Sequence, residues 1–177
     1  NDEKKVDVVY CGIDTDVFVP KPQTDFVVND FRIHGPYILH TSRLTPRKNP
    51  KLILASFEQL TSKYGFQNLK LVIAGKGWKE YLATRPTNPN IIALGYVSQD
   101  ALIALYSSCT AFWFLSQYEG FGLPVLEAMA CGAPTVISNQ YALAEIGEGS
   151  SILIDIDKAS AAESVASATA QLMSDSE

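Results

Sequence analysis

The feature that most constrains the fold is a regular alternation of short apolar runs with segments of helical character, which begins at Tyr37. Such alternation is typical of right-handed βαβ units, which build a mostly parallel sheet with helices on both faces. The sequence therefore predicts an α/β fold, a Rossmann-like parallel sheet of about six strands with helices on both faces. The predicted strands cover residues 37–40, 69–74, 91–94, 111–115, 135–137 and 152–154.

The segments between these runs are the predicted helices. Ser98 is a suitable N-cap for one of them, because its hydroxyl can accept a hydrogen bond from the first turn. Pro124 fits the first position of another, where its missing N–H costs nothing, and Gly132 fits the position after its end. The predicted helices cover residues 49–63, 78–83, 98–108, 123–131, 141–146 and 159–173.

The chain before Tyr37 has a different character. It holds a short apolar run at 6–10, a turn-like stretch at 11–14 and three prolines. We interpret residues 1–36 as a linker from a domain that this sequence lacks, and residues 37–177 as the folded domain. Because the first residue is not Met, we expect the sequence to be a fragment of a longer protein.

Charge and cysteine content narrow the range of partners. The net charge of −5 and the pI of about 5.0 argue against nucleic acid or an anionic membrane as the main partner. Cys11, Cys109 and Cys131 form no CxxC pair, which argues against zinc and suits a reducing, cytoplasmic compartment. No run approaches the roughly 18–20 apolar residues of a membrane span, so we expect no transmembrane segment.

Residues 118–132 contain the most informative group of polar residues. Glu119 stands just before a glycine-rich turn, and Glu127 follows eight positions later inside a predicted helix. The start of a helix offers unpaired backbone N–H groups and a partial positive charge, which favour a phosphate. A phosphate-bearing ligand with hydroxyl groups on both sides would use all of these groups.

A basic cluster is expected at the same edge of the sheet, since ligands of such sheets bind beyond the carboxyl ends of the strands. Arg43, Arg47, Lys48 and Lys51 follow the first predicted strand in a net acidic chain. Cations near a helix N-terminus are unfavourable for the helix itself, which hints at an external anion. We interpret the cluster as a diphosphate clamp, the alternative being a solvated loop.

Other kinds of site fit less well. Residues 75–77 form only a Gly-x-Gly, and no third glycine follows at the spacing of the dinucleotide fingerprint, so no nicotinamide site is expected. His34 and His40 have no obvious Ser, Cys or acid partner nearby and are interpreted as structural. The two glutamates could form a glycoside hydrolase pair, but the basic cluster and the phosphate-ready helix suit a nucleotide ligand better.

These motifs resemble the C-terminal half of the "group 1" (family four) retaining glycosyltransferases of the GT-B fold. The run 119–132 matches the family's two glutamates separated by seven residues, with Gly-Phe-Gly-Leu-Pro and Glu-Ala-Met-Ala-x-Gly around them. Residues 71–77 and 93–97 match its Val-Ile-x-Gly-x-Gly and Phe-x-Gly-x-Val. Residues 8–18 resemble its Asn-Gly-(Ile/Val)-Asp segment, except that Cys11 replaces the Asn. The chain also resembles bacterial mannosyltransferases of this family at residues 46–49 and 138–146.

The resemblance implies roles by position. Arg43 and Lys48 would hold the donor diphosphate and stabilise the departing nucleotide, and Glu119 would bind hydroxyl groups of the donor sugar, which makes these three the expected catalytic set. Glu127 would hold the ribose hydroxyls. The other expected donor-binding residues are Gly75, Tyr96, Val97, Gly120, Phe121, Gly122, Leu123 and Pro124.

The resemblance also implies the reaction and its partners. It implies hexosyl transfer with retention of configuration and without a metal or other cofactor, from a nucleotide-diphosphate sugar for which GDP-mannose is favoured. The acceptor would be a glycan or lipid-linked molecule of polysaccharide or lipopolysaccharide biosynthesis. A missing N-terminal half would bind this acceptor and make any peripheral contact with the inner membrane face, so we expect the present chain to be inactive alone.

Three alternatives remain open at this stage. The first is a GT-B nucleotide-sugar epimerase, against which the two-glutamate motif speaks. The second is a nucleotide-sugar-binding module that has lost catalysis, against which the intact set of cations and glutamates speaks. The third is a doubly wound domain without sugar chemistry, which failure to bind any nucleotide diphosphate would support.

Overall fold

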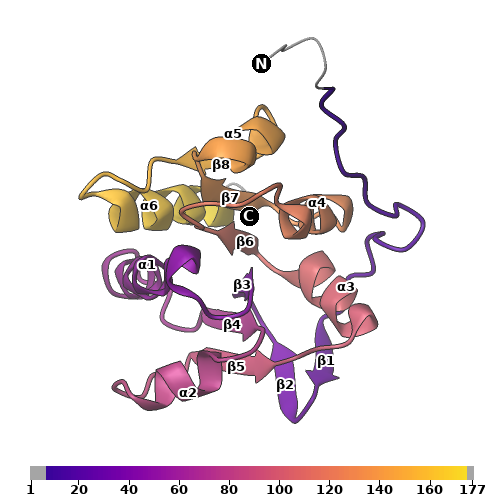
Figure 1. The fold of residues 1–177 in the computed structure, drawn as a ribbon. Helices are drawn as coiled ribbons and strands as arrows, with labels where there is room; N and C mark the ends of the chain where they lie inside the picture. Colours follow the sequence, from indigo (N-terminus) through magenta and orange to yellow (C-terminus); the bar gives the residue numbers. More distant parts are fainter. Residues whose placement is uncertain (1–6, 175–177) are drawn as a thin grey trace.

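The computed structural model describes residues 7–174 and shows the predicted α/β architecture (Figure 1). Residues 1–6 of the predicted linker and 175–177 of the predicted domain lie outside the described part. Six parallel strands form one sheet in the order β5-β4-β3-β6-β7-β8. Their bounds are β3 Tyr37–Thr41, β4 Lys70–Ala74, β5 Ile91–Gly95, β6 Ala111–Phe114, β7 Thr135–Ser138 and β8 Ile152–Ile154.

Helices cover both faces of this sheet. Side chains of α3, α4 and α5 pack into one buried cluster, and side chains of α1, α2 and α6 pack into another. A 3-10 turn, η2 (Pro46–Lys48), precedes α1. The helix bounds are α1 Pro50–Lys63, α2 Trp78–Ala83, α3 Gln99–Ser108, α4 Leu123–Ala130, α5 Tyr141–Gly147 and α6 Ala161–Ser174.

The continuous apolar runs of the strands follow from burial on both faces. Successive side chains of a strand point to opposite faces, so Ile38 and Leu39 of β3 enter different clusters although both are fully buried. All five residues of β3 are buried, as expected for a central strand of a parallel sheet. The alternation in the sequence therefore gave the correct strands and helices, with ends that differ by one or two residues.

The strand order reverses between β3 and β6. From β3 the chain runs outward through β4 to β5, then crosses back to place β6 on the other side of β3. In a doubly wound sheet the crevice beyond the carboxyl ends of the strands at this reversal is the usual place for a ligand. The segments that follow Thr41 and Phe114 border this crevice.

A two-stranded hairpin was not predicted. Strands β1 (Asp25–Val28) and β2 (Phe31–His34) pair antiparallel inside the segment interpreted as a linker. Val28 and Ile33 are buried in the cluster that α3 and α4 share. The strands have only four residues each and lie between prolines, which is why their weak alternation was not interpreted as a hairpin.

The predicted helix ends are mostly correct. Ser98 caps α3, since its Oγ accepts a hydrogen bond from the N–H of Ala101 at 3.3 Å. Gly132 follows α4 with a φ of 83°, the left-handed conformation expected after a helix end. Pro124 occupies the second position of α4 rather than the first, because the helix begins at Leu123.

Candidate functional site

An ion-pair cluster surrounds Glu119 at the switch point of the sheet. Arg47 donates from Nη1 to Glu119 Oε2 at 2.7 Å and to the carbonyl of Tyr118 at 2.9 Å. Lys48 donates from Nζ to the other carboxylate oxygen, Oε1. Both cations belong to η2, which follows β3, and Glu119 follows β6. The structure therefore joins the two loops that border the crevice through one carboxylate and two cations.

The backbone around η2 fixes the position of these cations. Asn49 ends the turn with a φ of 55°, a left-handed conformation that Asn tolerates better than most residues. The N–H of Gln117 donates to the carbonyl of Arg47 at 2.7 Å and ties the turn to the loop after β6. The Lys48 side chain is only 10% exposed, and its Nζ lies 4.4 Å from the centroid of the Phe114 ring. Lys48 is thus held in place on several sides.

Burial and the ion pairs shift the pKa values of Lys48 and Glu119 in opposite directions. Burial lowers the pKa of Lys48, although its hydrogen bond with Glu119 counters this effect. Burial would raise the pKa of Glu119, but the hydrogen bonds from Lys48 and Arg47 outweigh it and hold the pKa below the usual range. Glu119 is therefore an ionised hydrogen-bond acceptor at neutral pH.

Glu127 lines a separate cavity of about 260 Å³ at the same edge of the sheet. The cavity is formed by the ends of β3 and β4, the loop after β5, and helices α3 and α4. It brings together six of the residues predicted for donor binding or catalysis, from four different segments. These are Arg43, Gly75, Tyr96, Val97, Pro124 and Glu127.

The carboxylate of Glu127 has one hydrogen-bond partner in this cavity. The hydroxyl of Tyr106 donates to Glu127 Oε2 at 3.1 Å, and Tyr106 lies 3.2 Å from Thr41 Oγ1. Burial raises the pKa of Glu127 and outweighs the hydrogen bond from Tyr106. In contrast to Glu119, Glu127 makes no ion pair within residues 7–174, so hydroxyl donors of a ligand could fill its free acceptor sites.

The glycine-rich turn between the two glutamates packs against α5. Gly122 has a φ of 118°, and a Cβ there would lie 2.6 Å from Leu143 and 2.8 Å from Ile146. The N–H groups of Phe121 and Gly122 form no hydrogen bond with any part of the chain that the structure describes. Two unpaired donors just ahead of a helix are suited to an anion or to sugar oxygens. Gly120 belongs to the same turn, and Leu123 is the first residue of α4.

The predicted site residues thus fall into two neighbouring groups. Lys48 joins Glu119 in the ion-pair cluster, whereas Arg43 is exposed, makes no ion pair among the described residues and lines the Glu127 cavity. Tyr106, the partner of Glu127, was not among the predicted site residues, because its helical spacing with apolar neighbours indicates a core position. Arg47 was predicted as part of the basic cluster but not as a partner of Glu119.

Among the residues that the structure describes, histidines and other possible metal ligands do not gather at the site. His40 is buried, with Nδ1 2.9 Å from the carbonyl of Trp113 and Nε2 2.8 Å from Ser42 Oγ, which supports a structural role. No group of three or more His, Cys, Asp or Glu side chains that could hold a metal ion occurs among residues 7–174. Within the same range, no helix is long and apolar enough to span a bilayer.

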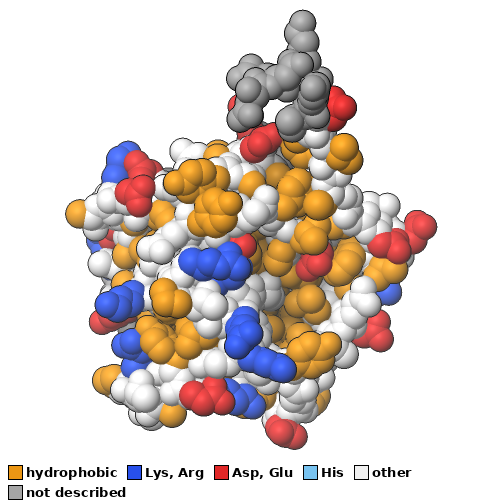
Figure 2. All heavy atoms as spheres, in the orientation of Figure 1, with side chains coloured by type: hydrophobic (Ala, Val, Ile, Leu, Met, Phe, Trp, Pro, Cys, Tyr) orange, Lys and Arg blue, Asp and Glu red, His pale blue; other side chains and the backbone are white. Residues whose placement is uncertain are grey.

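Figure 2 shows several Lys and Arg side chains across the middle of the face that is in view, beside a band of apolar side chains. The net charge of the whole chain is −5. Fold and site together define a doubly wound α/β domain whose crevice carries both cations and carboxylates.

Comparison with known proteins assigns the family. Residues 23–177 match the family described as glycosyl transferases group 1, so the chain belongs to that family. The O-antigen chain mannosyltransferase B of Escherichia coli is 35% identical over 124 residues, which cover 67% of this chain. They cover 32% of that relative, so the chain spans about a third of its length.

Solved structures support the fold. The C-terminal domain of a glycosyl transferase group 1 family protein (LpcC) from Francisella tularensis is similar with a TM-score of 0.68 and 21% identity, over 93% of this chain and 89% of that one. Sucrose-phosphate synthase from Thermosynechococcus elongatus is similar with a TM-score of 0.71 and 21% identity, over 93% of this chain and 42% of that one. The predicted fold, which is that of the Rossmann-like domain of a GT-B glycosyltransferase, is therefore confirmed.

Proposed function

We propose that this chain is the donor-binding domain of a retaining glycosyltransferase that moves a hexosyl group, favoured to be mannosyl, from a nucleotide-diphosphate sugar to a glycan or lipid-linked acceptor. The observation that carries the proposal is that the Glu119 cluster and the Glu127 cavity lie at the same edge of the sheet in a group 1 family domain. The mannosyl part is supported by the similarity to an O-antigen chain mannosyltransferase.

The proposed roles follow from charge and hydrogen-bonding capacity. Lys48 and Arg43 would bind the diphosphate and stabilise the negative charge on the departing nucleotide, which is the electrostatic contribution that a transfer of this kind needs. Arg47 is added to this set because it shares the Glu119 carboxylate with Lys48. A bound diphosphate would compete with Glu119 for these cations and leave the carboxylate oxygens to accept hydrogen bonds from the sugar.

The nucleoside would lie in the Glu127 cavity. The half-buried Glu127 carboxylate can accept hydrogen bonds from two neighbouring ribose hydroxyls, and Tyr106 fixes its orientation. Tyr96 and Val97 line the same cavity on the side where the base would extend. The free N–H groups of Phe121 and Gly122 would meet donor oxygens between the two glutamates. No cofactor is required by this scheme, and the acceptor would be held by a domain that this chain lacks.

A cytoplasmic location is part of the proposal. Cys11, Cys109 and Cys131 are all unpaired, which suits a reducing compartment. Any contact with a membrane surface would then be made by parts of the enzyme other than this chain.

Calorimetric titration of the chain with GDP-mannose, UDP-glucose and ADP-glucose tests the proposal. We expect GDP-mannose to bind selectively and Glu127→Ala to weaken it at least tenfold, with Glu148→Ala as a surface control. Selective binding of another donor would support the proposed glycosyltransferase function but contradict the proposal that the transferred group is mannosyl. If no donor bound to the full-length enzyme either, the proposal would be wrong. Isomerised sugar nucleotide from the full-length enzyme would instead support an epimerase, and binding without any product would support a non-catalytic module.

A further inference from the structure

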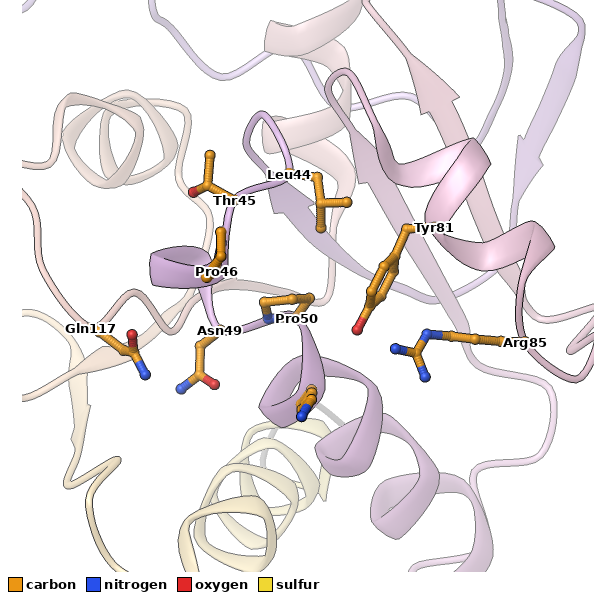
Figure 3. A pocket seen from close by; sticks show the side chains of 9 residues that line it. Leu44, Thr45, Pro46, Asn49, Pro50, Tyr81, Arg85 and Gln117 are labelled. Atoms are coloured by element: carbon orange, nitrogen blue, oxygen red, sulfur yellow. The ribbon is translucent and has the colours of Figure 1, made fainter.

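A second cavity, of about 480 Å³, lies beside the start of α1 and is separate from the Glu127 cavity (Figure 3). The loop after β3 contributes to both cavities, since Arg43 lines the Glu127 cavity and Leu44 lines this one. The two cavities share no lining residue. The volume lies within the range of small-molecule sites and far exceeds that of an inorganic anion.

The walls of this cavity combine apolar surfaces with hydrogen-bonding groups on two sides. Figure 3 shows the Tyr81 ring and the Arg85 guanidinium on one side and the Asn49 and Gln117 amides on the other. The guanidinium carbon of Arg85 lies 4.1 Å from the centroid of the Tyr81 ring. The apolar surface between the two sides comes from Leu44, Pro46 and Pro50.

The charge of the lining is positive, although the whole chain carries a net charge of −5. Lys51 and Arg85 line the cavity, and none of its lining residues is acidic. Neither cation forms an ion pair with any described residue. An anion bound here would therefore meet two cations that no carboxylate of the described chain neutralises.

We propose that this cavity is a binding site for an anionic sugar, a hexose that carries a phosphate or carboxylate group. The Tyr81 ring and the proline and leucine surfaces would take the apolar face of the sugar ring. The amides of Asn49 and Gln117 would pair with its hydroxyl groups, and Lys51 and Arg85 would bind its anionic group. This site is distinct from the donor crevice and does not depend on the identity of the donor.

An occupant would also touch the backbone that carries the Glu119 cluster. Gln117 donates its N–H to the carbonyl of Arg47 at 2.7 Å, and Asn49 ends the turn that presents Lys48. A ligand between Asn49 and Gln117 therefore contacts residues on either side of the ion pairs with Glu119. Binding in this cavity should be detectable at Glu119 as well as in the lining.

Nuclear magnetic resonance of the isotopically labelled chain tests the proposal directly. Mannose 6-phosphate and glucuronate serve as anionic sugars, and methyl α-mannoside and inorganic phosphate serve as the separate parts. We expect at least one anionic sugar to shift the side-chain amide signals of Asn49 and Gln117, with a Kd at least tenfold lower than either part alone. Absence of these shifts with both anionic sugars would overturn the proposal, as would phosphate binding as tightly as mannose 6-phosphate.

Matched variants locate the site. Arg85→Gln should weaken anionic-sugar binding at least tenfold, whereas Lys158→Gln, which removes an equal charge elsewhere on the surface, should leave it unchanged. Asn49→Gly keeps the left-handed backbone and should weaken binding through loss of the amide alone. Glu127→Ala should not affect anionic-sugar binding. The test of this cavity is therefore independent of the test of the proposed donor site. Equal binding by Arg85→Gln and the parent chain would refute the assignment.

Discussion

Glu119 and Glu127 carry the same charge but experience opposite electrostatic environments. The folded state lowers the pKa of Glu119, so its ionised form adds stability that is present above its unfolded pKa and is lost as the pH falls. The folded state raises the pKa of Glu127, so its ionised form reduces stability at neutral pH. The two carboxylates of one site therefore have opposite effects on the free energy of unfolding.

Neutral substitutions should separate these effects. At pH 7, Glu119→Gln should lower the free energy of unfolding by about 1–3 kcal/mol, because it leaves the buried Lys48 ammonium without its ionic partner. Glu127→Gln should raise the free energy of unfolding by up to about 1 kcal/mol, since the amide oxygen can still accept from Tyr106. Urea denaturation of both variants, with the exposed Glu148→Gln as control, measures the difference. Equal destabilisation by both would contradict the assigned environments.

His40 should dominate the acid sensitivity of the fold. Burial lowers the pKa of His40 to about 4, below the unfolded value of 6.5. The folded state therefore binds a proton at His40 more weakly than the unfolded state does. The contribution of His40 to stability is therefore fully present above pH 6.5 and is lost as the pH falls toward 4, by up to about 1.4 kcal/mol per pH unit. The surrounding groups that could compensate a charge are Lys48 and Glu119, and they act in opposite directions.

Denaturation series between pH 7 and pH 4 measure this slope. The His40→Gln variant should be less stable at pH 7, because it loses packing against Trp78, but its stability should fall less steeply with acid. His34→Gln, which changes the other histidine of the sequence at an exposed position, is the matched control. If His40→Gln kept the parent slope, another group would be responsible.

Side-chain pairings were the part of the site that sequence could not supply. Topology predicted that the groups following β3 and β6 would meet, because the carboxyl ends of parallel strands share one edge. The left-handed conformation of Asn49 and the hydrogen bond between the backbones of Gln117 and Arg47 decide which cation reaches Glu119. Neither feature can be predicted from the spacing of residues in the sequence. The partnership of Tyr106 with Glu127 similarly requires knowing how α3 packs beside α4.

The loops after β3, β4 and β5 form a single hydrogen-bonded unit beside the Glu127 cavity. Gly75 donates its N–H to the carbonyl of Gly95 at 2.7 Å, and the N–H of Leu44 donates to the carbonyl of Lys76 at 2.9 Å. Gly75 has a φ of 138°, and a Cβ there would lie 1.9 Å from the carbonyl oxygen of Ser42. Glycine is needed at this position because backbone atoms of two loops meet there.

Gly75→Ala should therefore lower the free energy of unfolding by at least about 3 kcal/mol, since the clash involves backbone that cannot move independently. Gly35→Ala is a matched control with a positive φ of 73° but no atom within 4 Å of the added carbon. It should cost only about 1 kcal/mol, from backbone strain alone. Chemical denaturation of the two variants gives the comparison, and similar values for both would show that the close approach is not decisive.

Strands and helices were predicted well where tertiary burial and local pattern agree. The central strands are buried on both faces and therefore have continuous apolar runs, which can be recognised in the sequence itself. The hairpin at Asp25–Val28 and Phe31–His34 has one buried residue in each strand, Val28 and Ile33. Its stability depends on packing against the domain rather than on its own sequence, so local reasoning had little signal to use.

At the scale of the whole molecule, an anionic donor would approach a chain of net charge −5. The long-range field therefore does not assist association, and affinity must come from short-range contacts in the crevice. For a chain with only one half of the proposed cleft, these contacts should support weak nucleotide binding but no detectable glycosyl transfer. Transfer by the 177-residue chain would contradict this expectation.

Thermal stabilisation by the donor provides the whole-molecule test. A ligand that binds only the folded state at one hundred times its Kd adds about 2.7 kcal/mol. For a chain of this size each kcal/mol raises Tm by roughly 2–4 °C, so GDP-mannose should raise Tm by about 5–10 °C. Glu127→Ala should abolish this shift at the same donor concentration, while His34→Gln should retain it. A full shift in Glu127→Ala would mean that the donor binds outside the Glu127 cavity, and the stabilisation would then have to come from contacts elsewhere on the chain.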